Sequence, residues 1–191
     1  MIKTIEEQMY EADIILSTIE KIDPDCIIAG GAPRDWYFNR QCKDIDLFLS
    51  LKQGLSNTKI KEMLSKLGLD VQQVNPINPD GLNYGLNPDI KVVFDVKNPD
   101  TATPIQIVVM NSSTFNTVDS FAFNICKIWY KNQKIRTTPS FKYAIDNKVL
   151  IKTGEIFRST DAYTKRIRDK FPNWPYFDSK LTYLKHVASC L

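Results

Sequence analysis

The sequence predicts an α+β domain in which a mixed central sheet is flanked by helices and followed by a short helical extension. The β-rich runs concentrate between residues 26 and 151, and amphipathic helical patterns lie at both ends of the chain and between those runs. A length of 191 residues suits one compact domain with a small appendage. We therefore expect one unit over residues 1–155 and a helical C-terminal extension over residues 156–191 packed on it.

The helices are predicted from apolar residues that recur at spacings of three and four and from local capping signals. Thr4 and Glu7 form a capping box, Thr117 and Thr138 are candidate N-caps, and Gly68 ends a helix. The predicted helices cover residues 2–22, 33–38, 58–67 and 118–121, a segment that begins at 138–139, and residues 160–171 and 178–189.

The strands are predicted from short apolar or alternating runs bounded by turn residues. Residues 98–100 are expected to close one hairpin and residues 131–132 another, and the proline- and glycine-rich stretch 75–89 is expected to form a loop. The predicted strands cover residues 26–29, 44–50, 90–96, 105–110, 123–130, 135–138 and 149–151.

The composition excludes several classes of protein. Hydrophobic residues make up 43% of the chain and charged residues 25%, which is typical of a globular domain and unlike disorder, collagen or coiled coil. No apolar run approaches the ~18–20 residues of a membrane span, and the acidic N-terminus is unlike a signal peptide. A net charge of +3 does not by itself indicate nucleic-acid binding. We expect a cytoplasmic protein without a membrane partner.

Cysteine and histidine are too few and too scattered for zinc or triad chemistry. The four cysteines, Cys26, Cys42, Cys126 and Cys190, form no C-x-x-C pair, and His186 is the single histidine. One histidine also weakens the case for a Ser-His-Asp triad or a Cys-His pair, so we expect His186 to be structural or on the surface.

Two aspartates in the predicted strand 44–50 indicate a metal site. Asp44 and Asp46 are two residues apart, so in a strand both side chains leave from the same face, with Cα atoms ~6.5–7 Å apart. Two carboxylates that converge at ~4 Å repel by roughly 4 kcal/mol at an effective dielectric of 20 unless a cation lies between them. Carboxylate oxygens are natural ligands of Mg²⁺ or Mn²⁺, which usually share the phosphates of a bound nucleotide. The alternative is a solvated strand end with no ion.

Two glycines about a dozen residues earlier suit a phosphate-binding turn. Gly30 and Gly31 follow an apolar strand and precede Pro33, which we expect at the first position of a short helix. Glycines let a backbone approach a ligand closely, and amides at a helix N-terminus favour phosphate. A phosphate cradle followed by a carboxylate pair is what phosphoryl or nucleotidyl transfer requires. The alternative for the glycines is a tight turn alone.

The segment GGAPRD followed by KDIDLF resembles the head of DNA polymerase β-like nucleotidyltransferases. It is most similar to the group of tRNA nucleotidyltransferases and bacterial poly(A) polymerases, whose signature is GG-x-x-RD and then D-x-D on the next strand. The resemblance covers residues 25–50, and the hairpin 90–110 agrees in outline. It implies a polymerase β-like mixed sheet and a metal-dependent transfer of a nucleoside monophosphate from a nucleoside triphosphate, such as ATP, to a hydroxyl.

The resemblance also implies roles for individual residues. Gly30 and Gly31 would hold the triphosphate, and Asp44 and Asp46 would ligate Mg²⁺ or Mn²⁺. Arg34 matches the RD of the motif and either contacts phosphate directly or forms a structural ion pair with Asp35 that fixes the turn.

Lys43 stands beside the first metal-ligating aspartate and joins the candidate nucleotide-binding residues. The acceptor is an RNA end, a protein side chain or another nucleotide, and the oligomeric state is not predicted.

Two departures from the family limit the assignment. Members commonly carry a third carboxylate on a strand beside the D-x-D strand, where this sequence has Gln106, and Asp95 on the preceding strand is the alternative third catalytic carboxylate. Nothing after residue 150 is long enough for the helical body with which tRNA nucleotidyltransferases measure tRNA, so a full CCA-adding enzyme is not expected. We predict a minimal nucleotidyltransferase. The alternative is a catalytically incomplete module of the same fold that binds a nucleotide or a partner.

Two further groups of residues have a structural and a functional interpretation. The cations of the predicted helix 160–171 are either a solvated face or a contact with a nucleic-acid backbone. The aromatic run 36–38 is either core or a surface on which a base stacks.

Overall fold

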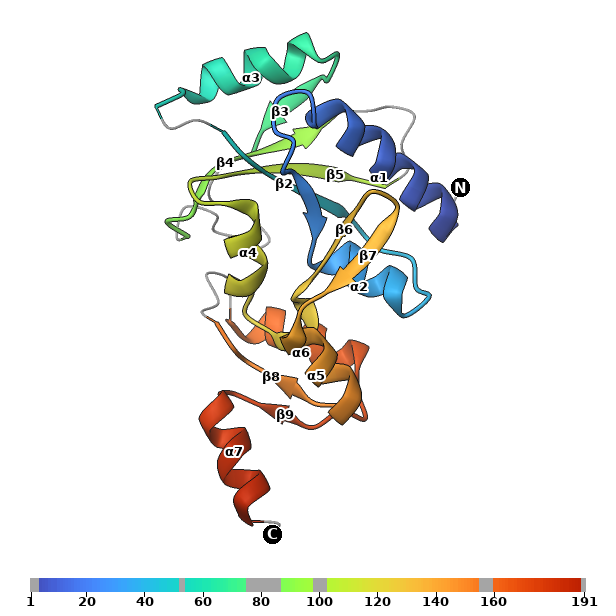
Figure 1. Cartoon of the computed structure of the whole chain (residues 1–191), viewed down its shortest axis with the longest axis vertical. Helices are drawn as coiled ribbons and strands as arrows, with labels where there is room; N and C mark the ends of the chain where they lie inside the picture. Colours follow the sequence, from blue (N-terminus) through green and yellow to red (C-terminus); the bar gives the residue numbers. More distant parts are fainter. Residues whose placement is uncertain (1–3, 52–53, 75–86, 98–102, 155–159, 190–191) are drawn as a thin grey trace.

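A seven-stranded mixed sheet forms the centre of the molecule (Figure 1). The computed structural model describes residues 4–51, 54–74, 87–97, 103–154 and 160–189. The strand order is β3-β4-β5-β2-β1-β6-β7; β2 and β5 run parallel, and the other neighbours in this sheet are antiparallel. The strands are β1 (Ile27–Ala29), β2 (Ile45–Ser50), β3 (Val71–Gln73), β4 (Ile90–Val96), β5 (Ile105–Met110), β6 (Ile128–Lys131) and β7 (Lys134–Thr137).

Helices surround this sheet, and a second, two-stranded sheet follows it. The helices are α1 (Ile5–Ile19), α2 (Gly31–Tyr37), α3 (Asn57–Lys66), α4 (Thr114–Ser120), α5 (Pro139–Asn147), α6 (Thr160–Lys170), α7 (Lys180–Ser189) and the 3₁₀ helix η2 (Asn124–Cys126). The second sheet pairs β8 (Leu150–Ile151) with β9 (Tyr176–Phe177) in parallel. Figure 1 shows α5, α6 and this small sheet beside one end of the large sheet, with α7 farthest from it. The predicted α+β class with a mixed sheet is confirmed.

No helix in the described part of the chain combines the length and the apolar character needed to cross a bilayer.

The large sheet has an apolar core on each face. One core is formed by the inward residues of β2, including Leu47 and Leu49, together with α1 and α3. The opposite face carries a smaller cluster in which Phe48 and Val108 pack with Val118 of α4. A third cluster gathers α5, α6 and η2, and its members include Phe123 and Phe171. Because both faces are covered, the polar residues of the sheet are confined to its ends and edges.

Several predicted elements are confirmed by their local capping contacts. Thr4 and Glu7 make both bonds of the capping box at the start of α1, and the Thr138 hydroxyl accepts from the Phe141 N–H at the start of α5. Gly68, with φ of +84°, follows the end of α3. The hairpin of β4 and β5 is present, whereas its predicted turn at 98–100 and most of the predicted loop, 75–86, lie outside the described residues.

Two helix starts differ from the prediction. α2 begins at Gly31, so Pro33 is its third residue and not its first. α4 begins at Thr114 after Ser113, earlier than the predicted cap at Thr117.

The predicted strand 123–130 is wrong in its first half, where the chain forms η2 before β6 begins. The cause is the buried side chain of Asn124. Its Oδ1 accepts from the N–H groups of Ile125 and Ile151, both at 2.9 Å, and its Nδ2 donates to the Val149 carbonyl at 3.1 Å. These bonds turn the backbone toward β8, and alternation in the sequence does not reveal a partner 25 or more residues away.

One buried glutamine joins four segments at the end of the sheet where β2 and β5 begin. Gln8 of α1 donates from Nε2 to the Cys42 carbonyl at 2.9 Å and to the Thr103 hydroxyl at 3.2 Å. Its Oε1 accepts from Trp36 Nε1 at 3.1 Å and from the Cys42 N–H at 3.0 Å. The amide therefore fixes α2 and the segment before Asp44 against α1.

We expect Gln8→Ala to lower the free energy of unfolding by about 3 kcal/mol, because buried donors of Trp36 and Cys42 lose their acceptor. In a chain of this size that corresponds to a fall in Tm of roughly 6–12 °C by calorimetry. The control is Ser17→Ala on the exposed side of α1, which should change stability by less than about 0.5 kcal/mol. Equal melting temperatures for the two variants would show that this network does not stabilise the fold.

Candidate functional site

The two halves of the sequence motif meet at one end of the sheet. β1 pairs antiparallel with β2, with Ile27 opposite Phe48 and Ile28 opposite Leu47. The end of β1 therefore lies beside the start of β2, because antiparallel strands run in opposite directions along the shared edge. Gly30 and Gly31 follow the last residue of β1, and Asp44 and Asp46 lie at the start of β2. The two pairs are therefore at the same end of the sheet. Register alone brings together residues that are 13 or more positions apart in the sequence.

Gly30 occupies a backbone conformation that requires glycine. It precedes α2 with φ of +81° and ψ of −113°, a region that L side chains rarely adopt. Its N–H donates to the Ile128 carbonyl of β6 at 3.0 Å, which fixes the turn to the sheet.

At Gly31 neither backbone conformation nor a close neighbour requires glycine. A Cβ there would meet no atom nearer than Arg34 Nη2 at 3.9 Å. The first glycine is thus explained by backbone conformation, and the second leaves open space beside the turn.

A row of polar residues crosses three adjacent strands on one face of the sheet. Asp46 of β2 lies opposite Gln106 of β5, and Gln106 lies opposite Asp95 of β4. Gln106 Nε2 donates to Asp95 Oδ1 at 2.8 Å. Facing residues of paired strands point to the same side of a sheet, so the three side chains share one face. Asp46 and Gln106 are half-buried, and Asp95 is exposed.

The register places Gln106 directly beside Asp46, at the position where the resemblance predicts a third carboxylate. Asp95 lies one strand farther, and two strand spacings put its Cα roughly 10 Å from that of Asp46. Asp44 is the last residue before β2 and is exposed. Asp46 therefore lies next to Gln106, and Asp95 lies on the far side of Gln106 from Asp46. Asp44 immediately precedes the first residue of β2.

The donor set fits a divalent ion that takes part of its coordination from a ligand. Within the described ranges, no group of three or more histidine, cysteine, aspartate or glutamate side chains converges to hold a metal by itself. Asp44 and Asp46 offer two carboxylates near the glycine turn. Mg²⁺ is commonly held by one or two carboxylates together with phosphate oxygens, so these residues fit a shared ion and not a closed protein site.

Arg34 and Asp35 form a buried ion pair. Arg34 is 5% exposed, and its Nε and Nη2 contact Asp35 Oδ1 at 2.9 and 2.8 Å. Arg34 Nη1 also lies 3.3 Å from the Cys126 sulfur, and Asp35 Oδ2 pairs with Lys170 of α6. These are the contacts of the structural alternative, in which the pair fixes the turn, so direct phosphate contact by Arg34 stays a prediction.

Lys43 is exposed in the bend before β2, one residue from Asp44. The neighbouring Cys42 is buried, and its burial, followed by the charges of Asp44 and Asp35, raises the pKa of the thiol to about 12. That thiol stays neutral near pH 7 and does not serve as a nucleophile. Lys43, by contrast, places an exposed positive charge directly beside Asp44.

Sequence reasoning missed two residues that support this end of the molecule. Gln8 occupies a position on the apolar stripe of α1, three residues after Ile5 and four before Ala12, and a glutamine in that place signals a buried amide with partners. Lys170 pairs with Asp35, but no local sequence pattern distinguishes it from the other cationic residues of α6.

Comparison with known proteins identifies the fold. No family model and no curated protein matches the sequence. A tRNA nucleotidyltransferase in complex with a primer tRNA and an incoming ATP analog matches with a TM-score of 0.51 and 13% identity, over 86% of this chain and 47% of that one. A CCA-adding enzyme in its apo form matches with a TM-score of 0.59 and 11% identity, over 96% and 43%.

The CCA-adding enzyme of Thermotoga maritima complexed with tRNA matches with a TM-score of 0.57 and 12% identity, over 94% of this chain and 42% of that one. The chain thus spans less than half the length of these solved structures. At such low identity the likeness concerns the architecture of the backbone. The chain has the polymerase β-like nucleotidyltransferase fold.

Proposed function

We propose that this protein transfers a nucleoside monophosphate from a nucleoside triphosphate to a hydroxyl group. The observation that carries the proposal is the β1–β2 register, which sets the Gly30-Gly31 turn beside the strand entrance with Asp44 and Asp46. This reaction needs a group that binds the triphosphate and a carboxylate pair that shares an ion with it, close to each other. The glycine turn and the two aspartates would supply them.

Each residue of the site has a task in this proposal. Asp44 and Asp46 would hold Mg²⁺ or Mn²⁺, an ion whose chemistry is to polarise the reacting phosphate and lower the pKa of a bound hydroxyl. Because the Gly30 N–H is bonded to Ile128, the Gly31 N–H at the start of α2 is the amide of this turn that would bind triphosphate oxygens. Lys43 would add a positive charge from the solvent side.

In the reaction a bond forms between the acceptor oxygen and the α-phosphorus, and the bond from that phosphorus to the pyrophosphate oxygen breaks. The hydroxyl proton goes to a base or to water. Asp95 is the remaining carboxylate of the polar row, and its bond from Gln106 orients one of its oxygens along that row. We therefore place Asp95 in the site as the third acidic residue, in a supporting position.

The acceptor is proposed as a class. The solved structures that share the fold include one with a primer tRNA and an ATP analog and one with tRNA, so ATP and RNA are the first substrates to test. The chain covers less than half of those proteins, and we therefore propose an RNA end, a protein side chain or a second nucleotide as the acceptor and not complete CCA addition. A cytoplasmic location suits such substrates.

A second candidate function is favoured by Gln106. An amide beside Asp46 supplies no charge where a third carboxylate would, which weakens the hold on a second ion. The chain would then bind a nucleotide or a partner without turnover. Calorimetry with each triphosphate, with and without Mg²⁺, separates the two functions when it is paired with a pyrophosphate-release assay, because the module binds and releases no pyrophosphate.

We expect the double variant Asp44→Asn, Asp46→Asn to lose at least about 100-fold in transfer of labelled nucleotide to an acceptor, because the carboxylate charge that faces the phosphates is removed. The substitutions are close in shape and lie where side chains are exposed or half-buried, so the melting temperature should stay near that of the wild type. The matched control is Asp146→Asn on the exposed side of α5. Undiminished transfer in the folded double variant would overturn the assignment.

We expect Gln106→Glu to make the stability of the protein depend on divalent ions. Three acidic residues would then lie in one row, which should cost about 1 kcal/mol in EDTA, and Mg²⁺ should restore that loss. The measurement is the melting temperature with and without Mg²⁺. Gln106→Ala removes the bond to Asp95 without adding charge and should show no such recovery. A Gln106→Glu protein indifferent to Mg²⁺ would argue against an ion at Asp46.

A further inference from the structure

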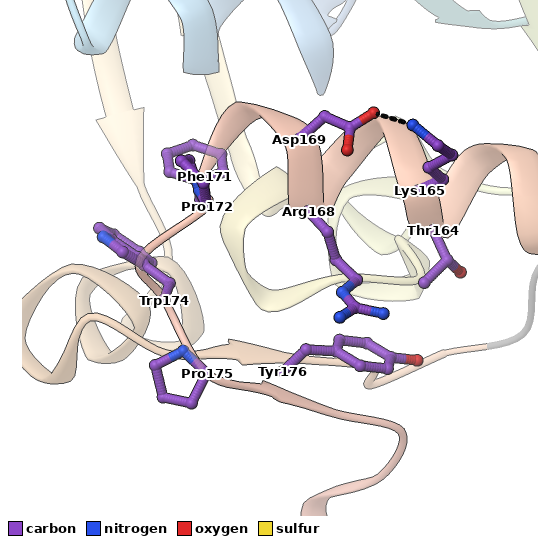
Figure 2. A pocket seen from close by; sticks show the side chains of 9 residues that line it. All are labelled: Thr164, Lys165, Arg168, Asp169, Phe171, Pro172, Trp174, Pro175 and Tyr176. Carbon is purple, nitrogen blue, oxygen red and sulfur yellow. Dashed lines mark hydrogen bonds and ion pairs between the residues drawn. The ribbon is translucent and has the colours of Figure 1, made fainter.

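A pocket of about 560 Å³ lies between α6 and the segment that leads into β9 (Figure 2). Its walls come from α6 and residues 171–176, and none of its lining residues belongs to the polar row or to the glycine turn. It is separated from that turn by α2, because Phe38, which follows α2, contacts the pocket residues Phe171 and Trp174. Seven helical residues span about 10 Å, so the pocket and the turn are distinct places.

Aromatic rings form two sides of this pocket. The Trp174 indole packs on Phe171 with ring centroids 4.9 Å apart, which fixes the orientation of the indole, and it remains half-buried. The Tyr176 ring lies under the guanidinium of Arg168 at 5.4 Å. Figure 2 shows the indole on one side of the hollow and the stack of Arg168 on Tyr176 on the other.

The charge available in the pocket is that of Arg168. Lys165 pairs with Asp169 at 2.7 Å, and these two exposed charges largely compensate each other. In the part of the chain that the structure describes, no ion pair engages Arg168, whose guanidinium lies over the ring of Tyr176 and lines the pocket. Such a preoriented guanidinium binds phosphate oxygens well, because its planar donors match their spacing.

We propose that this pocket binds one nucleotide unit, with its base against Trp174 and its phosphate on Arg168. A base stacked on an aromatic side chain contributes about 1–3 kcal/mol and tolerates any sequence, since every base has a π face. The same chemistry is offered by a free mononucleotide and by a unit of single-stranded RNA, and the experiment distinguishes these sources. The proposal goes beyond the transfer reaction and stands independently of it.

The test measures two probes in EDTA, so that a metal-dependent triphosphate site does not contribute. One probe is a fluorescein-labelled ten-nucleotide oligo(A) RNA followed by anisotropy, and the other is AMP followed by quenching of tryptophan fluorescence. Arg168→Gln should weaken binding about 10-fold through the lost charge-assisted bonds. For the RNA it should also reduce the slope of log affinity against log salt by about 0.7, the value for one phosphate contact on a single strand.

Arg136→Gln is the matched control, because Arg136 is an exposed arginine of β7 that does not line the pocket. It should leave both the affinity and the salt slope unchanged. Trp174→Phe keeps an aromatic ring and should retain binding while AMP-dependent quenching disappears. Quenching by AMP with the same dependence on Arg168 identifies a free-nucleotide site, and a response to the RNA alone identifies a strand site.

Three results would overturn the proposal. They are wild-type protein that binds neither probe, an Arg168→Gln variant indistinguishable from Arg136→Gln, and quenching that persists in Trp174→Phe. The Asp44→Asn, Asp46→Asn double variant must bind both probes like the wild type. Loss of binding there would assign the probes to the proposed transfer site instead, whereas loss of transfer with binding retained would separate the two sites.

Discussion

The antiparallel pairing of β1 with β2 is the constraint on which the candidate site depends. The alternation of side chains along β2 buries Leu47 against α1 and α3 and directs Asp46 to the opposite face. The same register therefore positions both the core and the polar row. A slip of one residue would place the carboxylate of Asp46 in the core formed with α1 and α3, which is strongly unfavourable. The glycine turn follows from the same pairing, because Gly30 ends β1 and is anchored to β6 through Ile128.

Buried polar contacts hold the ends of this arrangement where strand pairing no longer does. Gln8 fixes the segment before Asp44 from the side of α1. On the other side, Asp35 joins Arg34 to Lys170, so that α6 supports the short helix after the glycine turn. Such groups stabilise only when every partner is present, and removing one leaves a buried charge or amide unpaired. The geometry of the turn therefore depends on buried contacts with residues that are distant in the sequence.

Elements with local signals could be predicted from the sequence, and elements set by distant partners could not. The capping box of α1 and the Thr138 cap of α5 depend on contacts within a few residues, so their positions were predictable. η2 follows from bonds between Asn124 and the distant residues Val149 and Ile151, and alternation alone suggested a strand there. The two-residue strand β9 has too little sequence to show a pattern and exists through its pairing with β8.

The candidate site divides in the same way, and its least predictable member decides its chemistry. The glycines and the first two aspartates follow from motif spacing, whereas the place of Gln106 between Asp46 and Asp95 depends on how β2, β5 and β4 pair. Gln106 lies on the strand between the two carboxylates and donates to Asp95, so the two acidic side chains of the row are not direct neighbours. The same amide offers a cation less charge than a carboxylate would. Under the proposed function, this difference in charge decides between a catalyst and a binding module.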